Sequence, residues 1–204
     1  MIALVDYGVG NLFSLACSFR AIGQEARISK DADEIYRADR IILPGVGAFG
    51  DAAEKLKTSG LDEAVKSAAK KGTPLMGICL GMQLLFDKSF EYGEHEGLGL
   101  IRGSVVPIES AIDRPLKIPQ IGWNALIFRK PSKLFSYIKD GDYVYFVHSY
   151  FASGCEEAVT AETEYGAMLT ASVEKDNVYG CQFHPEKSGK VGLNILRAFC
   201  GEAG

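Results

Sequence analysis

Two short segments of the sequence bring together the residue types of a nucleophile and its base. Cys79 stands in Gly77-Ile78-Cys79-Leu80-Gly81, with a glycine two positions away on each side. His184 and Glu186 stand in Gln182-Phe183-His184-Pro185-Glu186, which follows an apolar run. A thiolate, an imidazole and a carboxylate are the groups that nucleophilic attack on a carbonyl carbon uses. We therefore take these three side chains as a candidate catalytic set.

The surroundings of Cys79 favour a strained turn between a strand and a helix. Small residues on both sides let such an elbow expose the nucleophile and present the next backbone N–H, here that of Leu80, to an oxyanion. Residues 82–86, apolar except for Gln83, predict a helix, whose N-terminus would favour the thiolate. A buried, inert cysteine at the end of a core strand is the alternative, and this motif alone supports both interpretations about equally.

His184 and Glu186 fit the roles of a base and of the carboxylate that orients it. Because they are two residues apart, an extended backbone would send both side chains to one face. Pro185 biases His184 toward that conformation. Taken alone, a loop histidine beside a solvated glutamate is the more frequent case, so the pair gains weight only together with Cys79.

The other two histidines are weaker candidates for the base. His148 lies in the strand-like run 146–150 with no carboxylate near it in the sequence, which favours a packed or hydrogen-bonded role. His95 lies between Glu94 and Glu96 in a loop bounded by glycines, a pattern typical of a solvated side chain. We predict no metal site.

Two glycine-rich turns follow apolar runs in the first half of the chain. The glycines of Pro44-Gly45-Val46-Gly47 permit a positive φ and close backbone approach, which would suit a second N–H donor to an oxyanion. On its own, however, this motif favours an ordinary turn. Gly8-Val9-Gly10 is similar to the start of a dinucleotide-binding loop, but Phe13 stands where the third glycine belongs. We predict a tight turn there and no cofactor.

The elements that must position these residues change character along the chain. In the first half, apolar runs at 2–5, 26–28, 41–43 and 75–78 predict strands, and helical periodicity predicts helices over 12–22 and from 61 to Gly72. In the second half, 143–150 and 173–183 predict strands, no long helix is expected between 90 and 171, and Leu193, Leu196 and Cys200 predict a C-terminal helix. The fold class is therefore α/β, with a mostly parallel central sheet flanked by helices and additional antiparallel or mixed strands in the second half, in one domain over 1–204.

The overall composition excludes several classes of function. The chain has 204 residues, 47% of them hydrophobic, and a net charge of −4 without a lysine and arginine cluster, so neither nucleic acid nor a membrane is an expected partner. Its five cysteines are scattered and form no CxxC pair, which excludes a disulfide framework and a zinc site. The first residues lack a signal peptide pattern, and no apolar run reaches the length of a membrane span. We expect a cytosolic, cytoplasmic protein.

Six motifs, considered together, resemble those of one enzyme family. They are Asp6-Tyr7-Gly8-Val9-Gly10-Asn11-Leu12, Pro44-Gly45-Val46-Gly47-Ala48-Phe49, Gly77-Ile78-Cys79-Leu80-Gly81-Met82-Gln83, Gly122-Trp123-Asn124, Phe146-Val147-His148-Ser149-Tyr150 and Gln182-Phe183-His184-Pro185-Glu186-Lys187-Ser188. Over its whole length the chain resembles the class I (triad) glutamine amidotransferases, whose fold is flavodoxin-like. Among them it is most similar to the glutaminase subunits of imidazole glycerol phosphate synthase.

The resemblance implies a role for each candidate residue. Cys79 would attack the side-chain carboxamide of L-glutamine, and His184, held by Glu186, would protonate the departing ammonia and then activate water on the thioester. The N–H of Leu80 and one from Val46 or Gly47 would form the oxyanion hole. Substrate-binding positions of the family are matched by Gly45, Gln83, Glu91, Ser149 and Tyr150.

The resemblance also implies a partner. In this family a separate (β/α)8 cyclase subunit forms a heterodimer with the glutaminase, receives the ammonia, and makes imidazole glycerol phosphate and aminoimidazole carboxamide ribotide in histidine biosynthesis. Glutamine hydrolysis is expected to be weak until the cyclase and its ligand bind, because the glycines beside Val46 let its N–H rotate away from the oxyanion. Positions facing the cyclase are matched by Asn11, Trp123, Tyr145 and Lys187, although Trp123 and Tyr145 equally fit core aromatics.

Three other functions are compatible with parts of the pattern. An amidotransferase subunit for another acceptor, such as chorismate, more often carries histidine where Met82 stands and lacks the Asp-Tyr-Gly-x-Gly-Asn start. A catalytically silent binding module would have no reason to keep Cys79, His184 and Glu186 together. A cysteine peptidase on the same scaffold would not need Gln83 and the glutamine pocket around it.

Overall fold

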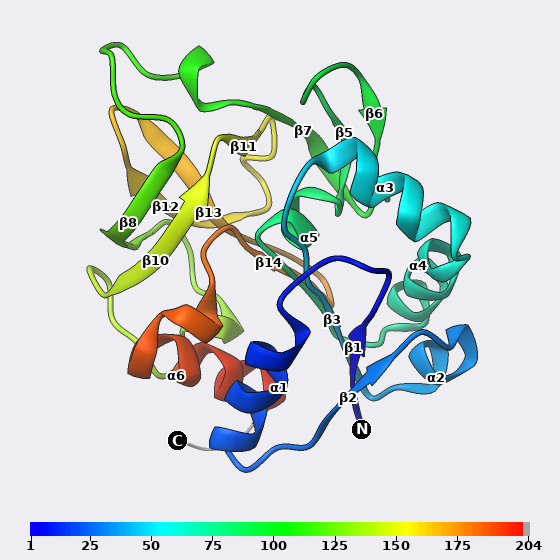
Figure 1. The fold of residues 1–204 in the computed structure, drawn as a ribbon. Helices are drawn as coiled ribbons and strands as arrows, with labels where there is room; N and C mark the ends of the chain where they lie inside the picture. Colours follow the sequence, from blue (N-terminus) through cyan, green and yellow to red (C-terminus); the bar gives the residue numbers. More distant parts are fainter. Residues whose placement is uncertain (202–204) are drawn as a thin grey trace.

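The computed structural model describes residues 1–201, and their central element is an eight-stranded sheet (Figure 1). Its first five strands run parallel in the order β2-β1-β3-β4-β14, and the remaining three, β13, β12 and β9, pair antiparallel. This confirms the predicted α/β class with a mostly parallel sheet, and the parallel part has the flavodoxin-like strand order. In the order of the sheet, the strands are β2 (Ala26–Ser29), β1 (Ile2–Val5), β3 (Arg40–Leu43), β4 (Leu75–Ile78), β14 (Val178–Cys181), β13 (Met168–Lys175), β12 (Val159–Glu164) and β9 (Ile127–Phe128).

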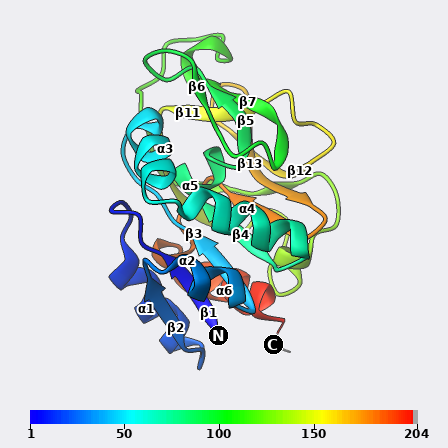
Figure 2. The same ribbon diagram turned by 90° about the vertical axis from the view of Figure 1, so that its right-hand side faces the viewer.

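Helices cover both faces of this sheet (Figure 2). One face packs against α2 (Ala32–Arg37), α3 (Phe49–Thr58) and α4 (Leu61–Lys71), and the other against α1 (Leu12–Ala21) and α6 (Gly189–Cys200). The side chains of β1 alternate between the two cores, with 3 and 5 on the first face and 2 and 4 on the second. A strand buried on both faces explains why the sequence shows an unbroken apolar run there.

The second half of the chain adds two smaller sheets beside the central one. In the first, β10 (Tyr143–His148) pairs antiparallel with β8 (Gln120–Ala125). The second has the order β11-β7-β5-β6. This confirms antiparallel and mixed strands in the second half. The members of the second sheet are β11 (Tyr150–Ser153), β7 (Ile101–Pro107), β5 (Phe86–Ser89) and β6 (His95–Glu96). There are also short 3-10 turns at Ile108–Ser110 (η1), Lys133–Phe135 (η2) and Pro185–Lys187 (η3).

Three predicted elements have different bounds in the structure. The run 143–150 is interrupted at Ser149, because β10 joins β8 in one sheet while β11 joins β7 in another. The run 173–183 turns back on itself between β13 and β14, with Asp176 at a φ of +54°. A helix follows Cys79 as predicted, but it is shorter than the expected run 82–86: α5 spans Leu80–Gln83, and Phe86 already begins β5.

The residues that carry the candidate chemistry follow the carboxyl ends of neighbouring parallel strands. Cys79 follows β4, His184 follows β14, and the segment 44–47 follows β3. Ligands of open α/β sheets bind at this edge of the sheet, so the topology brings segments far apart in the sequence to one place. Within residues 1–201, no helix combines the length and apolar character needed to cross a bilayer.

Candidate active site

Cys79 occupies the strained turn that its glycine neighbours predict. It lies between β4 and α5 with a φ of +53° and a ψ of −111°, and its N–H donates to the Cys181 carbonyl at 2.8 Å. A Cβ on Gly81 would lie 1.8 Å from the carbonyl oxygen of Leu43, and one on Gly77 would lie 2.5 Å from the Gly81 oxygen. The turn can therefore form only because both flanking positions lack a side chain.

The thiol of Cys79 has two polar contacts besides the histidine discussed next. Its Sγ lies 3.9 Å from the carbonyl oxygen of Val147 and 3.7 Å from Nε2 of Gln182. The side chain is buried but lines a cavity together with His184. A cysteine that borders a cavity and a histidine does not match an inert residue packed inside a core.

His184 and Glu186 form the pair that the sequence suggests, although by a different backbone path. Nδ1 of His184 lies 2.8 Å from Oε1 of Glu186, and the two side chains are only 3% and 2% exposed. His184 itself is extended, but Pro185–Lys187 forms the 3-10 turn η3, so the expectation of a continuously extended segment is wrong. Proline at the first position of such a turn is favoured because its φ is already fixed.

The environment of His184 favours the imidazolium. Burial alone would lower the pKa of His184, but interactions with Cys79 and Glu186 outweigh burial and raise the pKa to about 9. Nε2 of His184 has no hydrogen-bond partner at normal distance among residues 1–201. With Nδ1 held by the carboxylate, Nε2 is the ring nitrogen left for chemistry.

The backbone around His184 is tied to the neighbouring strand β10. The N–H of His184 donates to the Tyr145 carbonyl at 2.9 Å, and the N–H of Tyr145 donates to Ser188 Oγ at 3.0 Å. The Ser188 hydroxyl donates in turn to the His184 carbonyl at 2.6 Å. These three bonds form a closed ring that fixes the base relative to β10.

A cavity of about 280 Å³ adjoins the nucleophile and the base. This volume suits a small metabolite, since pockets for larger ligands extend from about 300 Å³ upward. Two predicted residues do not line this cavity: Gly45, predicted to bind the substrate, and the catalytic candidate Glu186. Glu186 lies behind His184, whereas a Cβ on Gly45 would lie 2.8 Å from the Tyr7 hydroxyl, so Gly45 allows close packing. The predicted residues in the lining are Val46, Gly47, Cys79, Leu80, Gln83, Glu91, Ser149, Tyr150 and His184.

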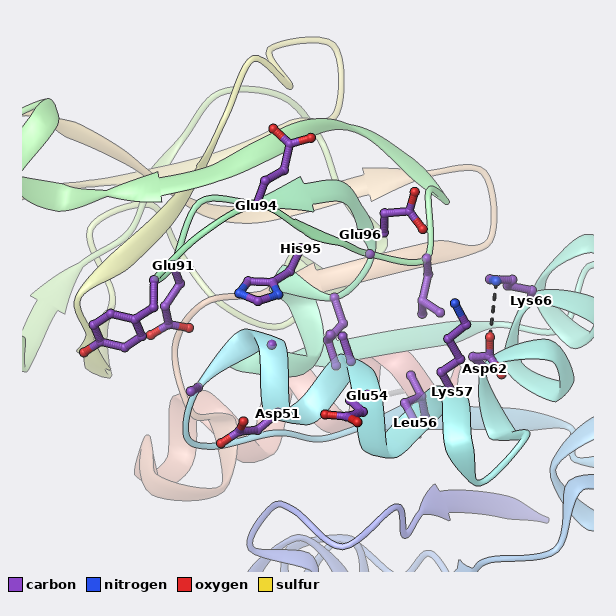
Figure 3. A pocket seen from close by; sticks show the side chains of 17 residues that line it. Asp51, Glu54, Leu56, Lys57, Asp62, Lys66, Glu91, Glu94, His95 and Glu96 are labelled. Carbon is purple, nitrogen blue, oxygen red and sulfur yellow. Dashed lines mark hydrogen bonds and ion pairs between the residues drawn. The ribbon is translucent and has the colours of Figure 1, made fainter.

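Glu91 also contacts the helix that follows the 44–47 segment. Its Oε2 accepts the N–H of Phe49 at 2.6 Å, at the N-terminus of α3, where a carboxylate interacts favourably with the helix dipole. A second cavity of about 590 Å³ lies on the far side of Glu91, between α3 and β6 (Figure 3). Cys79 and His184 do not line this larger space, so it is separate from the candidate catalytic set.

His95 lines the larger cavity and packs against α3. A Cβ on Gly50 would lie 2.7 Å from its Cε1 atom, and the side chain is half-buried, so the prediction of a solvated histidine holds only in part. Glu94 and Glu96 are exposed. Among residues 1–201, no group of three or more histidine, cysteine, aspartate or glutamate side chains is arranged to hold a metal ion.

Three of the four residues matched to partner-facing positions form a surface cluster. The rings of Trp123 and Tyr145 meet edge to face at 6.1 Å between centroids, and Nζ of Lys187 lies 5.7 Å from the centre of the Tyr145 ring. Trp123 is 52% exposed, which contradicts the alternative of a core aromatic for this residue. Asn11 is the N-cap of α1, where its side chain accepts the N–H of Ser14 at 3.2 Å.

The structure adds two buried polar residues that the sequence did not single out for the site. His148 lines the cavity, and its ring lies 2.8 Å from the Tyr150 carbonyl and 2.9 Å from the Gln120 side chain. Burial lowers the pKa of His148 to about 4, with a further contribution from nearby His184, so the ring is neutral at pH 7. Gln182 contacts Cys79. In the sequence it is a polar residue at the end of an apolar run and the first residue of the motif 182–188.

Comparison with known proteins agrees with this geometry. The family model described as glutamine amidotransferase class-I matches residues 3–203. The imidazole glycerol phosphate synthase subunit HisH of Caldanaerobacter subterraneus subsp. tengcongensis is 50% identical over 98% of this chain and 97% of its own. The protein of the same name from Wolinella succinogenes is 49% identical over 98% of both chains. A crystal structure of a glutamine amidotransferase has the same fold, with a TM-score of 0.76 at 19% identity over 98% of this chain and 97% of that one. The chain thus belongs to the class I glutamine amidotransferases.

Proposed function

We propose that this protein is the glutaminase subunit of an imidazole glycerol phosphate synthase. The observation that carries the proposal is a set of relatives named as this subunit, each about 50% identical over nearly its whole length. The buried His184–Glu186 pair beside the Cys79 elbow supports it, because a silent binding module needs none of these three groups in contact. The whole chain acts as one amidotransferase domain.

In the first half of the proposed reaction, the thiolate of Cys79 attacks the carboxamide carbon of L-glutamine. The new S–C bond places negative charge on the carboxamide oxygen, which the N–H of Leu80 and one N–H from Val46 or Gly47 stabilise. The C–N bond then breaks, and the imidazolium of His184 gives its proton to the departing nitrogen, which leaves as ammonia. Glu186 stabilises the imidazolium and holds the ring orientation.

In the second half, water hydrolyses the γ-glutamyl thioester. His184, now neutral, takes a proton from the water as its oxygen attacks the carbonyl carbon, and the C–S bond breaks to return the electron pair to sulfur. Glutamate leaves, and Cys79 and His184 are restored as an ion pair. Gln83, Glu91, Ser149 and Tyr150 bind the substrate in this proposal, as cavity-lining residues close to Cys79, and Gly45 shapes the segment beneath them.

The ammonia passes to a (β/α)8 cyclase subunit bound as the second half of a heterodimer. Support for this partner comes from the relatives, whose name describes them as one subunit of a synthase. The exposed Trp123, with Tyr145 and Lys187 packed beside it, provides an aromatic and cationic surface for docking, and Asn11 is assigned to the same contact. Tyr145 also bonds to the backbone of His184, so docking there is adjacent to the base.

The test measures glutamate released from glutamine by the purified chain alone, and then with the cyclase subunit and its nucleotide ligand. We expect release to rise strongly only with the liganded cyclase. The Cys79→Ala variant should abolish glutamine-dependent synthesis by the complex, by at least roughly a thousandfold, while ammonia-supported synthesis persists. Loss of both activities in Cys79→Ala would refute ammonia transfer, and a partner without effect would assign the chain to another acceptor enzyme.

A further inference from the structure

A chain of two buried side-chain amides ends at the nucleophile. Nε2 of Gln182 lies 3.7 Å from Cys79 Sγ, and Oε1 of Gln182 accepts from Nε2 of Gln83 at 3.0 Å. The same Nε2 of Gln83 donates to the backbone carbonyl of Tyr150 at 3.0 Å. Gln182 is fully buried and Gln83 is 5% exposed, so water does not compete for these bonds.

The donors and acceptors of this chain permit one orientation. The Tyr150 carbonyl can only accept, so the Gln83 atom facing it must be the NH2 group. That group then meets the Gln182 side chain with its second hydrogen, which requires the carbonyl oxygen of Gln182 at that contact. The NH2 group of Gln182 is consequently directed at Cys79. Turning either amide would place two acceptors or two donors against each other in a buried site.

Sγ of Cys79 contacts the Val147 carbonyl and the Gln182 amide, and these two contacts favour opposite protonation states of the sulfur. A thiol can donate its S–H to the Val147 carbonyl at 3.9 Å, whereas the negative charge of a thiolate is repelled by the negative end of that carbonyl dipole. The NH2 group of Gln182 donates best to the thiolate, since hydrogen bonds to a charged acceptor are stronger than those to a neutral one. Gln182 therefore offsets the preference of the Val147 carbonyl for the protonated thiol.

We propose that Gln182 is a further catalytic residue, which stabilises the thiolate of Cys79 through its side-chain NH2 group, and that Gln83 positions Gln182 for this contact. The proposal rests on the glutaminase function and deepens it. Gln83 donates one N–H to Tyr150 and the other to Gln182, so its side-chain carbonyl oxygen is the atom that remains for the substrate.

The contact acts at two points of the reaction. Before attack, it raises the fraction of Cys79 present as thiolate. During hydrolysis of the thioester, the C–S bond breaks and the electron pair returns to sulfur, and the Gln182 N–H then receives the developing negative charge. No proton moves to or from Gln182 in either step, so its contribution is electrostatic.

Other titratable groups also lie near Cys79. Burial raises the pKa of the Cys181 thiol and of the Tyr7 hydroxyl, so both stay neutral, and the pKa of His184 is raised to about 9. The remaining groups border the cavity or the base and are unchanged in the variants described next. The titratable groups that face Cys79 or its cavity are His184, Glu186, Cys181, Tyr7, His148, Tyr150 and Glu91.

The first test follows alkylation of Cys79 by iodoacetamide as a function of pH, with the Cys79 peptide quantified by mass spectrometry because the chain has five cysteines. Gln182→Met keeps a similar volume and removes the donor, so the midpoint should move up by about one pH unit, as expected for the loss of one charge-assisted hydrogen bond. Gln182→Glu places a carboxylate at the contact and should move the midpoint at least as far. If Gln182→Met does not fold, Gln182→Glu provides the same test.

A matched control separates this effect from a general loss of packing. Ser172 lies on β13 opposite Cys181, and its buried hydroxyl donates to the Gly180 carbonyl at 2.9 Å without a contact to Cys79. Ser172→Ala therefore removes a buried hydrogen bond from the same strand pair and should leave the alkylation midpoint in place. A midpoint that moves equally in Ser172→Ala and the Gln182 variants, or in none of them, overturns the proposal.

The second test separates the positioning role of Gln83 from substrate binding. Iodoacetamide does not need the glutamine pocket, so Gln83→Met should still raise the alkylation midpoint if Gln83 holds Gln182. A higher KM for glutamine with an unchanged midpoint would assign Gln83 to substrate binding alone and refute its positioning role. The alkylation midpoints in both tests are measured on the isolated chain without glutamine turnover, so they remain decisive even if glutamate release fails to support the glutaminase function.

Discussion

The two sides of the catalytic cavity are held in different ways. On the side of Cys79, a backbone bond to Cys181, two glycines in close contact and the buried His184–Glu186 pair fix the geometry. On the opposite side, Val46 is 45% exposed, Gly47 has a φ of +97°, and their N–H groups donate to no residue of the described part of the chain.

This difference separates two requirements of catalysis. Folding of the core is enough to place the nucleophile, the base and the N–H of Leu80, because each lies at the end of a buried strand. The second N–H of the proposed oxyanion hole has no such constraint, and glycine on both sides of Val46 lets its peptide group turn at little cost. A molecule that docks on the exposed side of the cavity can therefore control the orientation of the Val46 peptide group.

The largest expected effect on catalysis comes from Glu186→Gln, which alters the buried side of the cavity, where Cys79 lies. The neutral amide cannot stabilise the imidazolium and can accept or donate toward Nδ1, so kcat for glutamine hydrolysis in the complex should fall by roughly a thousandfold. Glu109→Gln, on an exposed turn, is the matched control and should leave kcat unchanged. A loss of less than tenfold in Glu186→Gln would show that the carboxylate does not support His184 and would remove the contrast between the two sides.

Glu186→Gln should also change how the free energy of unfolding depends on pH. The pKa of His184 is raised from 6.5 to about 9 in the folded protein, so the folded state holds a proton that the unfolded chain releases at lower pH. This contribution to the free energy of unfolding is fully present below pH 6.5 and is lost as the pH rises to about 9. Urea titrations across this range should show a smaller decline in Glu186→Gln than in the unchanged protein.

The sequence predicted the parallel half of the fold and the candidate catalytic residues for one physical reason. Strands buried on both faces, such as β1 and β4, appear as unbroken apolar runs, and a nucleophile after such a run with glycine on either side has few alternative structures. The C-terminal helix and the helix ended by Gly72 also follow their apolar periodicity, with Gly72 at a φ of +99°.

Other parts depended on tertiary contacts that a local pattern does not contain. Helix α2 is six residues long and buries one side chain, Ile35, so its periodicity is too short to register. Helix α3 buries Phe49, Ala52 and Leu56, whose helical spacing is a local signal for this helix in the sequence. The break of the strand run at Ser149 and the contact of Gln182 with Cys79 arise from residues far apart in the chain.

A second pair of variants tests the two sides through their glycines. Gly81→Ala forces a Cβ to within 1.8 Å of the Leu43 oxygen and should lower the free energy of unfolding by about 3–5 kcal/mol, near the upper end for single substitutions. Gly47→Ala meets no atom within 4 Å and should cost only the left-handed backbone penalty of about 1–2 kcal/mol. Urea unfolding gives both values. Equal losses would mean that the 44–47 segment is held as firmly as the elbow.

The smallest expected effect on kcat comes from truncating the two residues whose N–H groups are assigned to the oxyanion hole. Leu80→Ala removes a buried core side chain and should cost about 2–5 kcal/mol, whereas Val46→Ala should stay within about 0.5 kcal/mol because its side chain is half in solvent. Neither change removes an N–H, so kcat of the folded fraction should stay close to that of the unchanged protein in both. Urea unfolding and glutamate release on the same samples measure the two quantities. If Val46→Ala lowers kcat strongly without changing stability, the valine side chain itself takes part in binding the substrate or the partner, and the exposed side of the cavity acts through more than its backbone.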